Sequence, residues 1–249
     1  MNKDSAKKIE STFVLGSTST VAKAICLELA KNHECKRFHL ISRNPDQNQE
    51  LINKLKNKYS AFVTQEKVDL IDSSSIQNLT IPKVENFDLY IITAGSLGQP
   101  ELARESHKNA LEITAANYSG IVPWITSIAS KERLSRQGML WVFSSVAGDK
   151  GRPSNYHYGA AKAALTTLCE GLFLRCVGKP FSVRIIKAGY ITSPMTLGKA
   201  PNFLCIDANT VAKTLLRKPN SRGIEYLPWW WLLILLVVKI MPNSITSKL

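Results

Sequence analysis

Short apolar segments separated by longer mixed ones divide most of the chain into alternating strands and helices. Five segments have the length and the bounding polar residues of buried strands. They are residues 12–15, 38–41, 88–92, 139–143 and 182–186. The stretches between them carry helical patterns, including one that runs to Ala30 and a long one from about Glu101 to Ser130. Apolar strands that alternate with helices are typical of a parallel sheet covered on both faces. We therefore expect a single, doubly wound α/β domain with a mostly parallel sheet.

The pattern changes near residue 225, after which a continuous apolar segment follows. Residues 227–238 read LPWWWLLILLVV, with three adjacent tryptophans and no polar face. The basic residues that flank this segment are Arg217, Lys218, Arg222, Lys239 and Lys248. A helix of this length is about 20 Å long at ~1.5 Å per residue, which is short of the ~30 Å hydrocarbon core of a membrane. We therefore predict a globular domain over residues 1–225 and a hydrophobic, partly inserted membrane anchor over residues 226–249. A C-terminal oligomerisation segment is the alternative interpretation.

The charge of the chain supports a membrane partner. Its 249 residues include 32 Lys and Arg against 19 Asp and Glu, which gives a formal net charge of +13. Since no nucleic-acid-binding module is recognisable, we expect no nucleic-acid partner and attribute the charge to contact with anionic lipid. The polar N-terminal residues do not indicate a signal peptide. Five scattered cysteines and four isolated histidines indicate a reducing compartment and no metal site. We expect the globular domain to lie in the cytosol, at the cytoplasmic face of a membrane.

Three polar residues after the 139–143 strand form a candidate catalytic group. Ser145 ends this strand, so its hydroxyl is expected at the carboxyl edge of the sheet, where ligands bind. Tyr158 and Lys162 are four residues apart, which puts the phenol and the ammonium on one face of a helix. A nearby cation favours the phenolate, so we expect Lys162 to lower the pKa of Tyr158 from its ordinary value of about 10. Tyr156 is out of phase with Lys162 and is not expected to take part. A Tyr and a Lys that only pack on the helix are the alternative.

The chain resembles the short-chain dehydrogenase/reductase family at several places that occur in the family's order. These places are Gly16, Thr93-Ala94-Gly95, Asn117, Ser145, Tyr158 and Lys162. The resemblance covers most of the chain and implies a Rossmann-type, NAD(P)-dependent oxidoreductase. It implies that Tyr158 donates a proton to a ketone, that Ser145 holds the ketone oxygen and that Lys162 binds the nicotinamide ribose. Asn117 is implied to kink its helix and to hold a water that links Lys162 to solvent. A homodimer or homotetramer is also implied.

The loop after the first strand is the candidate phosphate-binding loop. Residues 16–22, GSTSTVA, join a strand to a helix whose free N-terminal N–H groups can bind phosphate. The family has three glycines here, whereas this chain keeps only Gly16 and has Thr20 and Ala22 at the other two positions. The loop residues that the resemblance assigns to the cofactor are Gly16, Ser17, Thr18, Ser19, Thr20 and Val21. An ordinary strand–helix turn is the alternative.

Residues that follow the other strands indicate which dinucleotide binds. Ser42 and Arg43 stand where an acidic residue would select NAD, and the arginine fork can pair with a 2′-phosphate. We therefore expect NADP(H), with NAD(H) less favoured, and a solvated Arg43 is the alternative. The resemblance also assigns to the cofactor site Asp69, Leu70, Ala94, Gly95, Tyr158, Lys162, Gly189, Ile191 and Ser193.

The substrate is the least specified part of the prediction. The GSTSTVA loop, the SVAG segment that starts at Ser145 and the Trp-rich tail resemble the reductases of polyprenyl-phospho-2-keto-pentoses, which act in cell-envelope polysaccharide biosynthesis. This resemblance implies a lipid-linked keto-sugar as substrate. The short segment before the tail is a candidate lid with an apolar surface, formed by Met195, Leu197, Phe203 and Leu204. A membrane-attached reductase of a steroid, fatty-acyl or other small apolar ketone is one alternative. A non-catalytic dinucleotide-binding scaffold is another, and the complete Ser145, Tyr158 and Lys162 set argues against it.

Overall fold

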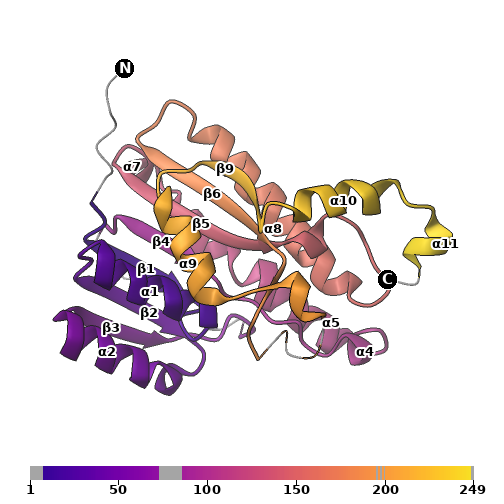
Figure 1. The fold of residues 1–249 in the computed structure, drawn as a ribbon, viewed down its shortest axis with the longest axis horizontal. Helices are drawn as coiled ribbons and strands as arrows, with labels where there is room; N and C mark the ends of the chain where they lie inside the picture. Colours follow the sequence, from indigo (N-terminus) through magenta and orange to yellow (C-terminus); the bar gives the residue numbers. More distant parts are fainter. Residues whose placement is uncertain (1–7, 73–85, 195, 197, 199, 248–249) are drawn as a thin grey trace.

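A parallel sheet forms the centre of the molecule. The computed structural model describes residues 8–72, 86–194, 196, 198 and 200–247, so that Met195 and Leu197 of the candidate lid lie outside the described residues. Within them, one sheet has seven parallel strands in the order β3-β2-β1-β4-β5-β6-β9 (Figure 1). Its strands are β1 (Ser11–Leu15), β2 (Arg37–Ser42), β3 (Phe62–Lys67), β4 (Leu89–Ile92), β5 (Gly138–Ser145), β6 (Phe181–Ala188) and β9 (Gly223–Leu227). The predicted parallel α/β sheet is confirmed. The strand order reverses between β1 and β4, which is where ligands of such sheets bind.

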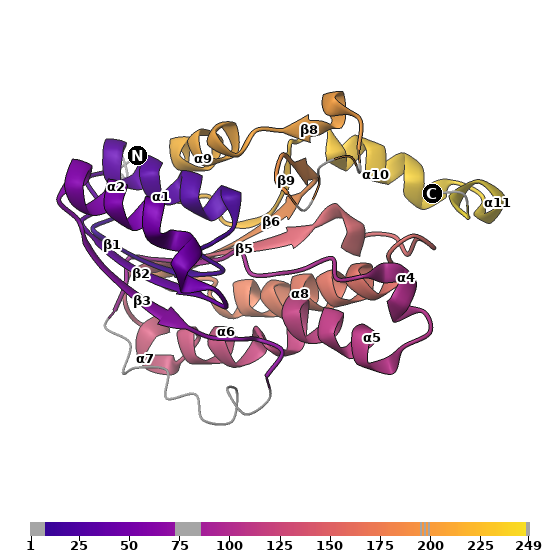
Figure 2. The same ribbon diagram turned by 90° about the horizontal axis from the view of Figure 1, so that it is seen from below.

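Helices cover both faces of the sheet (Figure 2). One face carries α1 (Thr20–Asn32), α2 (Gln49–Tyr59) and α9 (Ala208–Arg217). The other face carries α6 (Val122–Ile128), α7 (Lys131–Leu134) and α8 (Tyr156–Arg175). The remaining elements are η1 (Pro45–Asn48), α4 (Pro100–Ala103), α5 (His107–Thr114), η2 (Ala115–Ser119), η3 (Val146–Gly148), the paired β7 (Tyr190–Ile191) and β8 (Cys205–Ile206), η4 (Asn202–Leu204), α10 (Trp231–Ile240) and α11 (Asn243–Thr246).

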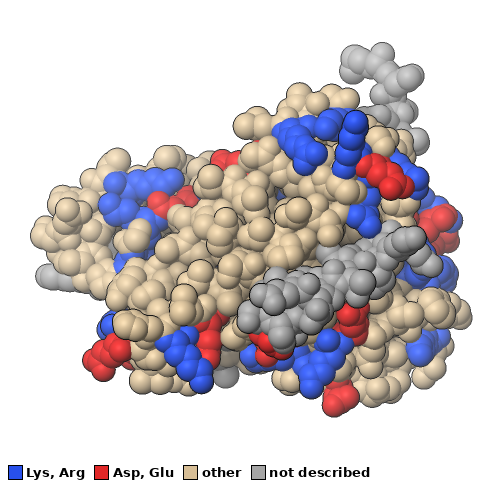
Figure 3. Space-filling view, turned by 180° about the vertical axis from the view of Figure 1, so that it is seen from behind, with Lys and Arg blue, Asp and Glu red and all other residues tan. Residues whose placement is uncertain are grey.

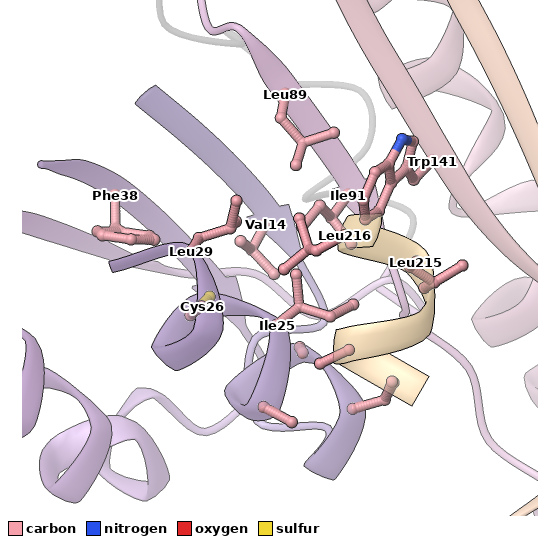
Figure 4. Packing of buried hydrophobic residues seen from close by; sticks show 14 of the residues in the cluster. Val14, Ile25, Cys26, Leu29, Phe38, Leu89, Ile91, Trp141, Leu215 and Leu216 are labelled. Carbon is pink, nitrogen blue, oxygen red and sulfur yellow. The ribbon is translucent and has the colours of Figure 1, made fainter. Parts of the chain in front are cut away.

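The central strands are buried on both faces, which explains why they appear in the sequence as continuous apolar segments. In β4, Leu89 and Ile91 pack into the cluster under α1 and α9, whereas Tyr90 and Ile92 pack into the cluster under α6 and α8. Figure 4 shows the first cluster, in which α1 and α9 lie over the strands with Trp141 of β5 at their side.

The helix predicted from Glu101 to Ser130 is wrong, because four shorter elements occupy this stretch. The π-helical turn η2 separates α5 from α6 and contains the buried Asn117. Gly120 follows this turn so close to the backbone of Leu70 that a Cβ atom would overlap the Leu70 carbonyl. A straight helix cannot pass this point, and the bulge redirects the chain toward α6.

The C-terminal segment folds onto the domain. The predicted boundary after residue 225 falls inside β9, which pairs with β6 and extends the sheet. Beyond β9 the apolar segment forms α10, whose buried Trp231 and Leu235 pack against Val146 of η3. In the described part of the chain, no helix has the length and apolar character needed to cross a membrane.

A buried arginine fastens β9 to the rest of the sheet. Arg184 of β6 donates hydrogen bonds to both carboxylate oxygens of Glu225, each at 3.0 Å, and its guanidinium lies 5.0 Å from the Trp141 ring centre. Its remaining donors reach the carbonyl oxygens of Leu215 at 2.9 Å and Lys218 at 3.1 Å. Because these bonds hold β9 in place, they also set the position from which α10 starts.

Candidate active site

The end of β5 and the middle of α8 are joined by side-chain hydrogen bonds. The Ser144 hydroxyl donates to the carbonyl of Lys162 at 3.1 Å and lies 2.6 Å from the Thr166 hydroxyl. Gly148 and Gly159 allow the close approach, because a Cβ on Gly148 would be 2.7 Å from the Ala163 nitrogen. This contact fixes the register between the strand that ends at Ser145 and the helix that carries Tyr158 and Lys162.

The structure brings Ser145, Tyr158 and Lys162 together. Tyr158 and Lys162 lie one helical turn apart, with the Lys162 ammonium 5.9 Å from the Tyr158 ring centre. The Lys162 Nζ donates to the carbonyl of Phe143 at 3.1 Å, and the Tyr158 hydroxyl is hydrogen-bonded to Ser145. All three residues line the same cavity. Tyr156, by contrast, is exposed and its ring lies 4.3 Å from that of His157.

The pKa values differ from the expectation that Lys162 lowers the pKa of Tyr158. Burial raises the pKa of Tyr158 above its ordinary value, against the opposing effects of the Ser145 hydrogen bond and the positive charge of Arg152. Burial also lowers the pKa of Lys162 to about 8. The spacing of the two residues could not reveal this, because burial of both groups disfavours their charged forms. In the protein alone, Tyr158 is therefore held as a neutral phenol, which is the form that can donate a proton.

Two adjoining cavities follow the carboxyl edge of the sheet. One has a volume of about 290 Å³ and the other about 320 Å³, and Thr18, Ser19, Thr93 and Gly95 line both. The predicted residues in the first cavity are Gly16, Thr18, Ser19, Arg43, Asp69, Leu70, Ala94 and Gly95. The second contains Thr18, Ser19, Thr20, Val21, Gly95, Ser145, Tyr158, Lys162, Gly189, Ile191 and Ser193. Each cavity is of the size of a small-molecule site, and together they form an elongated trough.

The loop at Gly16 fits the phosphates of a dinucleotide. Gly16 has a φ of +92°, and a Cβ there would overlap the backbone of Ala94. The Thr93 hydroxyl donates to the Gly16 carbonyl at 2.9 Å and fixes the turn. Ser19 caps α1 by accepting from the Ala22 N–H at 3.1 Å. The loop therefore presents an open helix N-terminus to the trough, despite Thr20.

Ser17 does not line the trough, in contrast to the other residues of the predicted loop. Its buried hydroxyl donates to the carbonyl of Ile41 at 3.2 Å and accepts from Asn48 Nδ2 at 2.9 Å. The same Asn48 nitrogen lies 3.4 Å from the Ser42 hydroxyl. Ser17 therefore holds the loop against β2 and η1, which is a supporting role that the motif alone could not distinguish from cofactor contact.

The opposite end of the first cavity presents groups for the adenosine part of a dinucleotide. Arg43 is exposed at the cavity edge, and Ser42 beside it also lines the cavity while its hydroxyl lies 3.4 Å from Asn48 Nδ2. Asp69 accepts a hydrogen bond from the N–H of Ile71 at 3.1 Å, which fixes its side chain beside Leu70. Arg43 and Leu70 thus give this end of the cavity a basic and an apolar side chain.

Asn117 stands behind the catalytic residues. Its Oδ1 accepts from the N–H of Ser96 at 3.1 Å, and its Nδ2 donates to the carbonyls of Ser96 at 2.6 Å and Ile113 at 2.8 Å. A Cβ on Gly95 would be 2.6 Å from the Asn117 Oδ1 and 3.1 Å from the Lys162 Nζ. The Asn117 and Lys162 side chains therefore meet against Gly95, and Asn117 fastens α5 and η2 to the strand end.

Two features of the site were missed by the sequence analysis. Trp231 lies so close to Gly189 that a Cβ on Gly189 would overlap the indole. Asp149, four residues after Ser145, forms an ion pair with Lys187 at 2.7 Å and accepts from the Tyr226 hydroxyl at 2.5 Å. The single acidic residue in a basic segment was a possible signal for Asp149. Its partners come from distant segments, so nothing in the local pattern could identify them.

Comparison with known proteins gives a family match over most of the chain. The family model described as short chain dehydrogenase matches residues 10–202. An uncharacterized oxidoreductase of Mycobacterium tuberculosis is 29% identical over 160 residues, which are 64% of this chain and 64% of that protein. The chain thus spans less than two thirds of the length of that relative. A 7beta-hydroxysteroid dehydrogenase of Mediterraneibacter gnavus is 25% identical over 194 residues, or 76% of this chain and 71% of that protein.

Solved structures share the fold. An actinorhodin polyketide ketoreductase with NADPH has a TM-score of 0.69 at 16% identity, with 84% of this chain and 89% of that chain covered. A short chain dehydrogenase of Mycobacterium paratuberculosis bound to NAD has a TM-score of 0.69 at 17% identity, with 88% of this chain and 97% of that chain covered. At such identities the likeness concerns the fold alone.

The buried charge of Lys162 is expected to lower the free energy of unfolding of this protein. Its lowered pKa means that the folded state loses the proton near pH 8 and the unfolded state near 10.5, so wild-type stability rises between these pH values. Lys162→Met should therefore raise the free energy of unfolding at pH 7 by roughly 1–3 kcal/mol, and this gain should shrink as the pH approaches 10.5. Urea denaturation of both proteins at pH values from 7 to 10.5 measures this difference in the free energy of unfolding.

Lys213→Met, at an exposed position of α9, is the matched control and should show no such pH-dependent gain. A Lys162→Met protein that is less stable than the wild type at pH 7, or whose advantage grows with pH, contradicts the buried-charge assignment.

Proposed function

The chain belongs to the short-chain dehydrogenase family, and on that premise we propose that it reduces a ketone to an alcohol with NADPH. The observation that carries the proposal is the convergence of Ser145, Tyr158 and Lys162 on one cavity, which continues into the trough at Gly16. Each group in this set has a separate task in ketone reduction, and a scaffold would need none of them.

The protein groups act on the ketone oxygen. Ser145 and Tyr158 both offer O–H donors to it, and their mutual hydrogen bond places them side by side. As negative charge develops on this oxygen, the two donors stabilise it and Tyr158 transfers its proton. The raised pKa of Tyr158 keeps the phenol protonated at the start of the reaction. Lys162, fixed by the Phe143 carbonyl, offers positive charge to the phenolate that remains.

The described residues fit a bound dinucleotide. Gly16, Thr18, Ser19 and the N-terminus of α1 would hold its phosphates, and Gly189, Ile191 and Ser193 would lie beside its nicotinamide. A reduced nicotinamide supplies hydride to the carbonyl carbon when it is bound. Arg43 favours NADPH over NADH, because its guanidinium at the cavity edge can pair with a 2′-phosphate.

We propose a lipid-linked keto-sugar as the substrate, presented at a membrane surface. The net charge of +13 and the exposed apolar side chains of α10 support an enzyme that works at an anionic lipid surface. The cytosolic face is where we place the catalytic domain, as a homodimer or homotetramer. A small apolar ring ketone is the second candidate, favoured by the relative that is a 7beta-hydroxysteroid dehydrogenase.

Replacing the proton donor tests the reaction directly. Tyr158→Phe should reduce turnover at least ~100-fold, because proton transfer by a positioned side chain contributes on that scale. NADPH binding should stay within about twofold of the wild type. NADPH oxidation is followed with membrane lipid extracts and with a panel of soluble apolar ketones, which also separates the two substrate candidates.

Tyr156→Phe is the matched control, two residues away and exposed, and should keep wild-type turnover. Equal losses in the two variants, or full activity of Tyr158→Phe, would remove Tyr158 from the mechanism.

Cofactor choice depends on Arg43. Arg43→Asp should weaken NADPH binding by roughly 1–3 kcal/mol, through loss of a charge-assisted contact and new repulsion of the 2′-phosphate, and should affect NADH far less. Fluorescence titration with both cofactors measures this. Lys213→Asp makes the same change from a basic to an acidic residue on an exposed face of α9 and should leave both affinities unchanged. Wild-type protein that binds NADH as tightly as NADPH contradicts the assignment.

A further inference from the structure

Helix α10 has two opposite apolar faces, and only one of them is covered. The inner face carries Trp231 and Leu235, which are buried against Val146, with Tyr190 and Leu204 packed alongside. The other face is exposed to solvent. We call it the outer stripe and define it as Trp229, Leu232, Leu233, Leu236, Val237 and Ile240. These side chains are between 43% and 83% exposed, and their spacing of three and four residues places them along one side of the helix.

The inner face is held in place by a buried ion cluster. Lys239 at the end of α10 pairs with Asp149 at 3.3 Å, and the Asp149 side chain is only 2% exposed. Lys187 of β6 and the Tyr226 hydroxyl of β9 donate to the same carboxylate at 2.7 and 2.5 Å. Burial alone would raise the pKa of Asp149, but these donors and the charge of Lys239 outweigh it and hold the pKa below its ordinary value. The carboxylate is therefore charged at neutral pH and keeps α10 on the domain.

The outer stripe projects from the body of the molecule. Figures 1 and 2 both show α10 and α11 extending beyond the end of the sheet, at the end of the molecule where α4 and α5 also lie. Phe203 of η4 is 79% exposed, and its neighbour Leu204 packs on the inner face of α10. Tyr190 packs on the same inner face of α10 and is followed by Ile191, which lines the active-site cavity.

We propose that the outer stripe is a membrane-binding face that lies in the headgroup region of an anionic bilayer while α10 stays docked on the catalytic domain. This mode differs from the predicted anchor, since only one side of the helix enters the lipid. Because Tyr190 packs on α10 and precedes Ile191 of the cavity, this mode also brings that side of the cavity toward the lipid surface, a consequence that rests on the proposed function.

The observations favour a lipid surface over a second copy of the chain. The outer stripe holds six residues, whereas a stable protein interface uses about 20–30 residues on each side. The outer stripe forms a convex ridge on a projecting helix. Fluid lipid can adapt to such a ridge, whereas a protein partner would need a groove of complementary shape. Trp229 at the start of the stripe is suited to the headgroup boundary.

Charge points to an anionic surface. The sequence has no Asp or Glu after Glu225, so nothing acidic in this segment opposes contact with anionic headgroups. Figure 3 shows Lys and Arg side chains beside the largely uncharged end of the molecule that the C-terminal helices form. Basic side chains around an apolar ridge are the combination that binds anionic membranes.

Vesicle binding of the full-length protein tests the proposal. Wild-type protein should co-sediment with vesicles of phosphatidylcholine and phosphatidylglycerol at 3:1, and its Trp emission should shift to shorter wavelength as Trp229 leaves water. Leu233→Glu/Leu236→Glu should lower the partition coefficient at least ~tenfold, because two apolar contacts become charges. Leu174→Glu/Val177→Glu is the matched control, since both residues are as exposed as the stripe but lie at the C-terminal end of α8 and just after it. It should bind like the wild type. Wild-type protein in 1 M salt should bind more weakly, because salt screens the basic side chains, but should not be released, because the outer stripe still enters the lipid.

Three outcomes overturn the proposal. They are wild-type protein that stays in the supernatant, stripe variants that bind as the wild type does, and a wild-type dimer in sedimentation velocity that the stripe substitutions split without vesicle binding. NADPH oxidation with a soluble apolar ketone should be equal in all of these proteins, since no stripe residue lines the cavities. Vesicle binding without any ketone reduction would overturn the proposed function and leave the membrane-binding face standing.

Discussion

The hydrogen bonds between Ser144 and α8 are the contact on which the active site depends. They join the C-terminal end of β5 to the carbonyl of Lys162 and the hydroxyl of Thr166, in the buried space between the sheet and the helix. A helix could pack on this sheet in several registers with similar apolar burial, but only one register satisfies these buried polar groups. In that register Tyr158 meets Ser145 and the Lys162 ammonium reaches the end of β5. The position of the trough and of its cofactor residues follows from the same sheet edge.

Burial then decides the chemistry of the three groups. Loss of water raises the pKa of Tyr158 and lowers that of Lys162, so the site by itself is a neutral proton donor beside a cation that is costly to bury. Such a site is prepared for reduction, in which the phenol must start protonated. The stability given up at Lys162 is balanced elsewhere, by the apolar clusters on both sheet faces and by the hydrogen bonds of Arg184 to Glu225 and Leu215.

The sequence predicted the parts of this molecule that depend on local spacing. Five strands could be predicted because burial on both faces makes them continuously apolar, and the helix-turn spacing brought Tyr158 and Lys162 together. The edge strands β3 and β9 were not predicted, because they have exposed and polar positions. The missed features depend on contacts between distant segments. Ser17 faces Asn48 and not the trough, and the helix through Asn117 breaks where Gly120 meets a distant carbonyl. The tail was predicted as a partly inserted membrane anchor, and its composition could not reveal that Lys239 of α10 pairs with Asp149 of the domain.

The central claim is that this set of residues catalyses hydride transfer to a ketone with protonation of its oxygen. The most direct measurement is deuterium transfer from NADPH carrying deuterium at C4 of the nicotinamide, with the alcohol product analysed by mass spectrometry and NMR. Membrane lipid extract and a bicyclic apolar ketone serve as the two substrate sources. The account predicts one deuterium on the carbinol carbon of the product from at least one source. Tight NADPH binding with no deuterated alcohol from either source would contradict it and indicate a dinucleotide-binding protein without catalysis.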